Sequence, residues 1–436
     1  ERVDRLEVQA RERIQTLQAI MLENGFPVTD DQGQQVLDAA GEPKVTPFMR
    51  WERGKPQPVR SMAAIKRAAA EAYNIPVDAK GLYCGDPDLI AGLQAQGLLT
   101  DGGKTGKIGM STAKLVLEES GDPLLISLGE AGEWAAVWNK DLKVFRLAAT
   151  TGLPISTKFG FAATTRTTSG GKGMLLGMNE QNLRKKEGIR ECFVSRWGAL
   201  VATDYTGLEN GTLAQAIVWG LGRRTMADKI NAGWNFHAEV GSLIMAEGGG
   251  PLLDMQTFLD LKESGDPMAT ECYGAAKPLN FGLPGFMKKA STVQSYARIG
   301  YKVNRPVAFW QKMIDLWYRT QHDQVAYLEQ YVESFATDPG RHGTLYNIPI
   351  PGTDIIRRGA TRTAAANTGF QGAGAQLAGD GLYRVCKAQI LGDMPGRACA
   401  FVHDEVISDC KPLDRDQVAY YQEKYMIQAA EENVPN

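Results

Sequence analysis

Three carboxylates lie at two places in the sequence where short apolar runs predict strands. Asp204 closes the run "GALVATDYTG", and Asp404 and Glu405 lie in the middle of "ACAFVHDEVISDC", 200 residues further on (404 − 204). Runs this far apart can bring their acids together only if they pair in one small sheet. Repulsion would then raise the pKa values of the acids unless cations neutralise them. The pattern favours Mg²⁺, which takes one or two carboxylates together with substrate phosphates.

The chemistry that such a site supports is displacement at phosphorus. Two divalent cations about 3.5–4 Å apart activate an attacking hydroxyl and stabilise a leaving phosphate. The alternative is a hairpin turn with exposed acids, which is the more common origin of a lone Asp-Glu pair. The apolar flanks, "AFV" before and "VIS" after, argue against this alternative.

The rest of the chain predicts helices that must carry these strands. Residues 1 to about 150 show helical spacing, for example over 1–25 and 61–74, and "STAKLVLEES" has Ser111 as a predicted N-cap. Residues 211 to 335 show the same spacing. The expected order is therefore helices, a strand, a long helical insertion and a second strand.

Three further segments carry specific expectations. "TTSGGKGM" predicts a loop, and "GTLYNIPIPG" predicts a hairpin or an extended loop. Residues 361–390 predict a helix with a break near Gly369, and a helix is expected at the C-terminus.

The composition is that of an ordinary soluble globular protein, with 43% hydrophobic and 22% charged residues. The net charge of −2 (48 − 50) argues against a polyanion partner, but basic stretches at 164–196 and 271–305 suit phosphate binding along one groove or, equally, solvated helix faces. The six cysteines have neither zinc-site nor disulfide spacing. With no apolar span or signal peptide, we expect a cytoplasmic protein with no membrane partner.

Six segments together resemble the family A DNA polymerases, the group of bacterial DNA polymerase I and many phage replicases. "ATDYTGLE" resembles the first catalytic motif, "VHDEV" matches the other, and "KPLNFG" resembles the motif of the fingers helix. Three more segments agree in order: "TTRTTS", "NEQNLRKKEGIRECFV" and "RRGATRTAAANTGFQG".

The resemblance implies an α+β right-hand fold, with a small antiparallel palm sheet, a helical thumb and helical fingers. The implied divisions are 1–155 for the thumb and N-terminal helical region, 156–235 for the first part of the palm, 236–340 for the fingers and 341–436 for the second part of the palm. The implied activity is extension of a primer 3′-hydroxyl with dNTPs and release of pyrophosphate. We expect two Mg²⁺ ions, for which Mn²⁺ can substitute, and no proofreading exonuclease within this chain.

The resemblance also implies roles for individual residues. Asp204 and Asp404 would hold the metal ions with the Tyr205 carbonyl, and Glu405 would be an auxiliary carboxylate. Lys277 would pair with the triphosphate and protonate the leaving pyrophosphate, and Phe281, four residues on, would pack against the incoming base and sugar. The other implied contacts are Glu209 as the sugar gate, His237 and Tyr273 at the nucleotide, and Arg166, Gln371, Arg358, Asn367 and His403 at the primer-template DNA.

Three positions depart from the family pattern, and one of them is Asn210, where Arg is common. Tyr273 stands where an Arg usually binds phosphate, and Lys288 or Lys289 is a candidate for the missing cation. Gly285 stands where a Tyr stacks near the template base, and its loss would loosen the end of the helix. These departures suggest a phage or otherwise divergent member.

Two other classes stay open. A single-subunit RNA polymerase shares the palm and the Lys of the fingers, although Glu209 and Phe281 favour DNA. A primer-template binding protein with impaired catalysis is suggested by Tyr273 and Gly285. The expected partners are primer-template DNA and dNTPs, with a processivity factor or other replisome protein as an open addition, and a monomer is expected.

Overall fold

The computed structural model describes residues 1–28, 34–50, 52, 58–100, 106–184, 186–337 and 343–435. The chain divides into two compact units: Glu1–Ile155 with Lys186–Cys192, and Ser156–Lys185 with Phe193–Asn436. The division expected at 340/341 lies outside the described residues. In the described part of the chain, no helix is long and apolar enough to cross a membrane.

The first unit consists of helices with two short antiparallel pairs of strands. Its helical segments are α1 (Arg2–Glu23), α2 (Met62–Ala72), η1 (Pro87–Leu89), α3 (Ile90–Ala95), α4 (Lys114–Glu119), α5 (Pro123–Ala136), η3 (Val137–Asp141), α6 (Leu142–Thr151) and η5 (Arg190–Cys192). Its strands are β1 (Gly25–Pro27), β2 (Val45–Pro47), β3 (Met49–Arg50) and β4 (Val59–Arg60), paired β1 with β2 and β3 with β4. The helical spacing predicted α1 and α2 well. The Ser111 cap is wrong, because α4 begins at Lys114 with Ala113 at its N-cap and no capping side chain.

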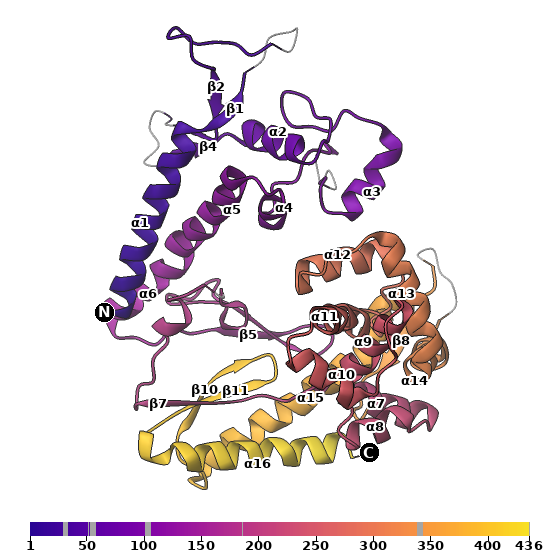
Figure 1. Cartoon of the computed structure of the whole chain (residues 1–436). Coiled ribbons are helices and arrows are strands. Elements are labelled where there is room, and N and C mark those ends of the chain that lie inside the picture. Colours follow the sequence, from indigo (N-terminus) through magenta and orange to yellow (C-terminus); the bar gives the residue numbers. More distant parts are fainter. Residues whose placement is uncertain are drawn as a thin grey trace. The chain divides into compact units, whose positions relative to one another are not determined.

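The second unit contains a three-stranded antiparallel sheet in the order β10-β11-β7 (Figure 1). Strand β7 (Ala199–Thr203) pairs with β11 (Glu405–Cys410), and Val406 faces Thr203. The prediction that the two acidic runs pair is therefore confirmed. Asp404 is not inside a strand, however, because β10 (Arg397–Val402) and β11 form a hairpin whose turn is His403 and Asp404.

The chain reverses at this turn because of an unusual backbone conformation, which the residue types do not predict. His403 adopts a positive φ of 61°, which non-glycine residues rarely take. Since neither Gly nor Asn marks the position, the β-prone run looked continuous. The hairpin alternative was therefore right about the local structure, but Asp404 is half-buried and not freely exposed.

Two long helices cover the sheet, α15 (Arg362–Leu391) and α16 (Arg415–Asn433) (Figure 1). The apolar side chains between them include Val385, Phe401, Val406 and Val418. Helix α15 runs unbroken past Gly369, so the expected break is wrong. Gly369 serves close packing instead, because a Cβ there would overlap the buried hydroxyl of Tyr327.

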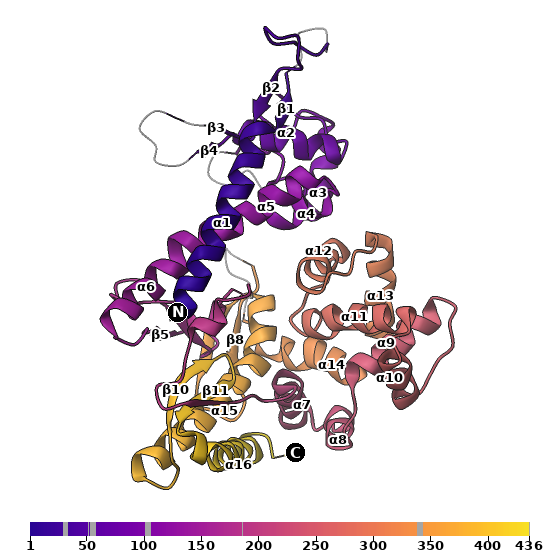
Figure 2. The same ribbon diagram turned by 60° about the vertical axis from the view of Figure 1, so that its left-hand side comes forward.

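Most of the other helices of the second unit form a bundle that packs on α15, and in it α9, α10, α11 and α13 lie side by side (Figure 2). Its helical segments are α7 (Leu208–Leu221), α8 (Thr225–Asn231), α9 (Phe236–Glu247), α10 (Met255–Glu263), α11 (Pro267–Gly282), α12 (Ala290–Tyr301), α13 (Val307–Thr320), α14 (His322–Ala326), η6 (Tyr327–Tyr331) and η7 (Glu333–Phe335). Buried Trp310, Trp317 and Tyr327 are the largest side chains of its core. The expected helical insertion is confirmed.

Two hairpins and two single turns complete the second unit. They are β5 (Lys158–Phe161) with β6 (Thr167–Gly170), β8 (Tyr346–Pro349) with β9 (Ile356–Ala360), η4 (Glu180–Asn182) and η8 (Pro412–Asp414). The β8–β9 hairpin agrees with the expectation for "GTLYNIPIPG". The segment "TTSGGKGM" is a loop only in its second half, since its first four residues are β6.

Candidate functional site

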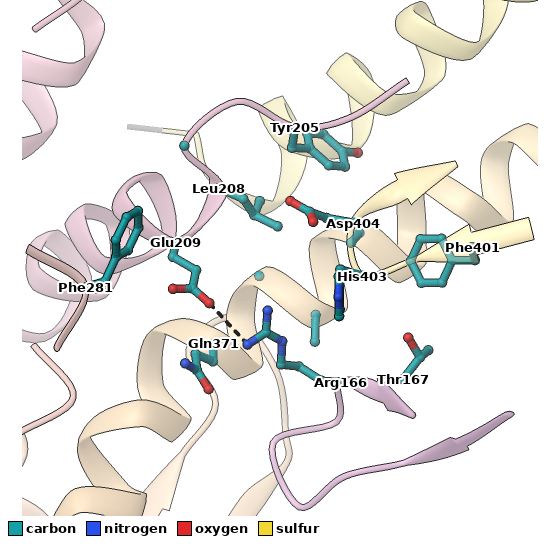
Figure 3. Close-up of a pocket in the computed structure, with 14 residues that line it drawn as sticks. Arg166, Thr167, Tyr205, Leu208, Glu209, Phe281, Gln371, Phe401, His403 and Asp404 are labelled. Atoms are coloured by element: carbon teal, nitrogen blue, oxygen red, sulfur yellow. Dashed lines mark ion pairs between the residues drawn. The ribbon is translucent and has the colours of Figure 1, made fainter. Parts of the chain in front are cut away.

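One pocket of the second unit, with a volume of about 230 Å³, collects residues from five parts of the chain. Figure 3 shows Asp404 and Tyr205 on one side of it, Arg166 and Gln371 below, and Phe281 beyond Glu209. The side chains and backbone that line it belong to Arg166, Thr167, Tyr205, Gly207, Leu208, Glu209, Phe281, Gln371, Gly374, Ala375, Ala378, Phe401, His403 and Asp404. Seven of the predicted site residues thus line a single cavity.

The two aspartates are brought together by strand register. Asp204 directly follows β7, Asp404 directly precedes β11, and the two strands are hydrogen-bonded neighbours. Burial and the negative charge of Asp204 raise the pKa of Asp404, while the charge of Arg166 works in the opposite direction. A cation beside the half-buried Asp404 would stabilise its ionised form against both effects.

A buried polar network beneath the sheet supports both aspartates. The Gln422 amide nitrogen of α16 donates to Thr203 Oγ1 (3.0 Å) and to the Val406 carbonyl (2.6 Å), and Ser408 donates to Gln422 Oε1 (2.6 Å). Gln422 and Ser408 are completely buried. Thr203 precedes Asp204 and Val406 lies two residues after Asp404, so one side chain ties both carboxylate-bearing segments to the same helix.

Tyr205 is held by its hydroxyl, which donates to the Met426 carbonyl at 2.9 Å. Gly381 of α15 makes room for this, because a Cβ there would overlap the hydroxyl. Burial and the nearby Asp380 carboxylate raise the pKa of Tyr205. The phenol is therefore a neutral anchor for the backbone that joins Asp204 to α7.

Glu209 lies in the first turn of α7 and forms an ion pair with Arg166 at 3.2 Å (Figure 3). Burial raises the pKa of Glu209, and Asp404 adds to this effect while Arg166 opposes it. Arg166 follows Thr165, whose φ of 60° belongs to the turn between β5 and β6. The Arg166 guanidinium thus offsets the negative charge of two carboxylates, Glu209 and Asp404.

One face of α15 contributes more to the pocket than the predicted Gln371. Gln371, Gly374, Ala375 and Ala378 line the pocket at helical spacing i, i+3, i+4 and i+7. Small side chains at three of these positions leave the space that the pocket occupies. The spacing of these small residues after Gln371 could have predicted this face from the sequence.

A second group of predicted residues lies on α9 and α11. Lys277 and Phe281 are one turn apart on α11, as predicted, and the His237 ring centroid lies 5.0 Å from that of Phe281. The Tyr273 ring meets His237 edge to face at 5.8 Å. Since Phe281 also lines the pocket, α11 connects this group to the acidic one.

His237 has a defined hydrogen-bonding state. The Asn280 amide nitrogen lies 3.1 Å from His237 Nδ1 and donates to the Phe236 carbonyl, while Asn280 Oδ1 accepts from Trp317 Nε1. These partners orient the amide, so Nδ1 accepts and the proton lies on Nε2. Burial, with a further effect of Lys277, lowers the pKa of His237 to about 4.

Three predicted residues lie outside both groups. Arg358 is an exposed residue of β9, and Glu405 begins β11 opposite Val402. Asn367 of α15 donates to the Gly285 carbonyl at 3.3 Å, and a Cβ on Gly285 would lie 2.7 Å from Asn367 Oδ1. Gly285 does not loosen a helix end, because α11 ends at Gly282.

The donors at the acidic pocket suit a hard divalent cation. Within the described ranges, no three His, Cys, Asp or Glu side chains form a metal-binding group. The oxygens of Asp204, Asp404 and the Tyr205 carbonyl are hard donors, the type that Mg²⁺ takes together with substrate phosphates. The raised pKa of Asp404 agrees with a pair of acids that needs such a cation.

This architecture is the fold of a DNA polymerase domain. The polymerase domain of Pol1 from M. smegmatis, in complex with DNA primer-template and dNTP, is similar with a TM-score of 0.54 and 20% sequence identity. The match covers 84% of this chain, which spans 60% of that one. No protein-family model matches the sequence, and no curated protein does. The structural similarity establishes the fold, although the two sequences share only 20% identity.

Proposed function

We propose that this chain is the catalytic polymerase part of a template-directed DNA polymerase, which extends a primer 3′-hydroxyl with dNTPs and releases pyrophosphate. The observation that carries the proposal is that strand register brings the segment ending in Asp204 next to Asp404, and that Asp404 lines a pocket with Arg166, Glu209 and Phe281. The polymerase fold supports it. In this proposal residues 1–155 are the thumb, 156–235 and 341–436 the palm, and 236–340 the fingers.

The predicted site residues divide the tasks of this reaction among them. Asp204, Asp404 and the Tyr205 carbonyl would hold two Mg²⁺ ions, with Glu405 as an auxiliary carboxylate. When bound, these ions activate the primer hydroxyl and stabilise the leaving pyrophosphate. Lys277 would bind the triphosphate, and Phe281 would pack against the incoming base and sugar.

The pocket also favours deoxyribose over ribose. Arg166 holds the Glu209 carboxylate in place beside Phe281 (Figure 3), so the side chain would exclude a 2′-hydroxyl. We expect Glu209→Ala to raise ribonucleotide incorporation in a primer extension assay. Equal use of ribonucleotides and deoxyribonucleotides by the wild type would favour the RNA polymerase alternative.

The decisive experiment is Mg²⁺-dependent primer extension by the wild type and by Asp404→Asn. Loss of one metal-binding carboxylate should lower the rate by about 10³-fold or more. Asp416→Asn removes the same charge from an exposed residue of α16 and should leave the rate unchanged. Extension that survived in Asp404→Asn would exclude the mechanism, and a wild type that bound primer-template without extending it would favour the impaired-binder alternative.

A further inference from the structure

Tyr273 of α11 lies against two lysine ammonium groups that come from different helices. Lys262 Nζ of α10 is 4.8 Å from the centre of the Tyr273 ring, and Lys277 Nζ of α11 is 5.1 Å from it. Both distances are within the range of cation–π attraction. The ring therefore gathers two positive charges at one place.

These two charges have no carboxylate to neutralise them within the described part of the chain. The nearby lysines that do form ion pairs are Lys229, with Glu239, and Lys312, with Glu247. Neither Lys262 nor Lys277 takes part in an ion pair there. Two unneutralised ammonium groups at one ring repel each other, so their arrangement is stabilised by an anion.

Two neutral groups add hydrogen-bond donors to the same place. The Asn235 amide donates to the Tyr273 hydroxyl at 3.4 Å, which leaves the hydroxyl proton available to a ligand. The His237 ring meets Tyr273 edge to face, and its proton lies on Nε2 because Nδ1 accepts from Asn280. The cluster of Lys262, Tyr273, His237 and Lys277 thus offers two cations and two neutral donors.

The cations that the sequence suggested in place of an Arg at position 273 lie elsewhere. Lys288 Nζ is 4.5 Å from the Phe286 ring and 5.4 Å from the Tyr318 ring. Lys289 is the N-cap residue of α12. Lys262, from a helix that no motif marked, is the lysine that joins Lys277.

We propose that Lys262 binds the triphosphate of the incoming nucleotide together with Lys277, and that Tyr273 is the platform that holds both ammonium groups. This inference rests on the proposed function and deepens it, since it assigns a further residue to the nucleotide site. A highly charged phosphate chain is the ligand class that satisfies two cations and two donors at once. Lys262 supplies from α10 the charge that Tyr273 does not carry.

The test is steady-state incorporation of a single dNTP on primed DNA. Lys262→Met keeps most of the apolar stem and removes the charge, so the KM for dNTP should rise about tenfold with kcat within about twofold of wild type. Lys312→Met removes a lysine of α13 outside the cluster and should leave KM unchanged. A thermal unfolding midpoint near that of wild type verifies that the variant folds.

A rescue variant separates a charge role from a structural one. Tyr273→Arg in the Lys262→Met background restores a cation at the same place and should return KM to within about threefold of wild type. An unchanged KM in Lys262→Met would overturn the role of Lys262.

Calorimetric binding of inorganic tripolyphosphate tests the same residue without catalysis. Lys262→Met should weaken this binding about tenfold, while Lys312→Met should not. A wild type that extends no primer would overturn the proposed function alone, and the tripolyphosphate affinities would still decide the role of Lys262.

Discussion

The acidic pocket and the basic cluster of the second unit are built in different ways. The acidic pocket is held by backbone, because the register of β7 and β11 and the buried network of Gln422 determine where Asp204 and Asp404 lie. The basic cluster is held by side chains of α9, α10 and α11 that meet around Tyr273. A backbone-held site tolerates little change in its residues, whereas a side-chain cluster can take its charge from another helix.

The largest effect is expected where the acidic pocket is tied to α16. Gln422→Leu would leave the half-buried hydroxyl of Thr203, the buried hydroxyl of Ser408 and the Val406 carbonyl short of a partner, at a cost of about 3 kcal/mol in the free energy of unfolding. If the network positions the aspartates, kcat should fall while KM for dNTP stays near that of wild type. Denaturant unfolding and steady-state extension would measure both effects.

The matched control for this change is Gln294→Leu. Gln294 is also a buried glutamine, but it lies in α12 and only its Nε2 has a partner, the Arg305 carbonyl. We expect a loss of about 1 kcal/mol and an unchanged kcat. Equal losses of kcat in the two variants would mean that Gln422 has no special tie to the aspartates.

An intermediate effect is expected from pH at the basic cluster. His237 has a pKa of about 4 in the folded protein against 6.5 for the ordinary group, because it is buried and lies near Lys277. The unfolded chain therefore binds more protons between these values, so stability is lost as the pH falls from 6.5 towards 4. Between pH 8 and pH 5 this contribution is about 2 kcal/mol.

His237→Gln removes the titrating ring and serves as the comparison. The difference in unfolding free energy between wild type and variant should shrink by about 2 kcal/mol on going from pH 8 to pH 5. A difference that stayed constant over this range would show that the pKa of His237 is not lowered in the folded protein. The basic cluster and the acidic pocket would then differ less in how strongly burial affects their titrating groups.

The smallest effect is expected at Gly285, where the bundle meets α15. A Cβ at this position would lie 2.7 Å from Asn367 Oδ1, so Gly285→Ala should cost about 1 kcal/mol. In an Asn367→Ala background the same change should cost almost nothing, because the crowding atom is absent. A double-mutant cycle on unfolding free energies measures this coupling, and additive costs would exclude it.

Much of the architecture could be predicted because local patterns agree with it. Helical spacing predicted α1, α2 and the long insertion, and β-prone composition predicted β7 and the region of β11. Two predictions were wrong: the helix break at Gly369 and the continuous strand through His403 and Asp404. At both positions a distant partner or a rare backbone conformation decides the local structure, and neither is visible in neighbouring residues.

The sequence by itself determined which chemistry-bearing residues exist and in what order, because their types and short spacings are local properties. Lys277 and Phe281 share a helix face for the same reason. Only the tertiary structure decided that Asp204 and Asp404 flank paired strands, that Arg166 pairs with Glu209, and that Lys262 lies against Tyr273. These are contacts between segments far apart in the chain, and folding selects them through burial and hydrogen bonding of the whole unit.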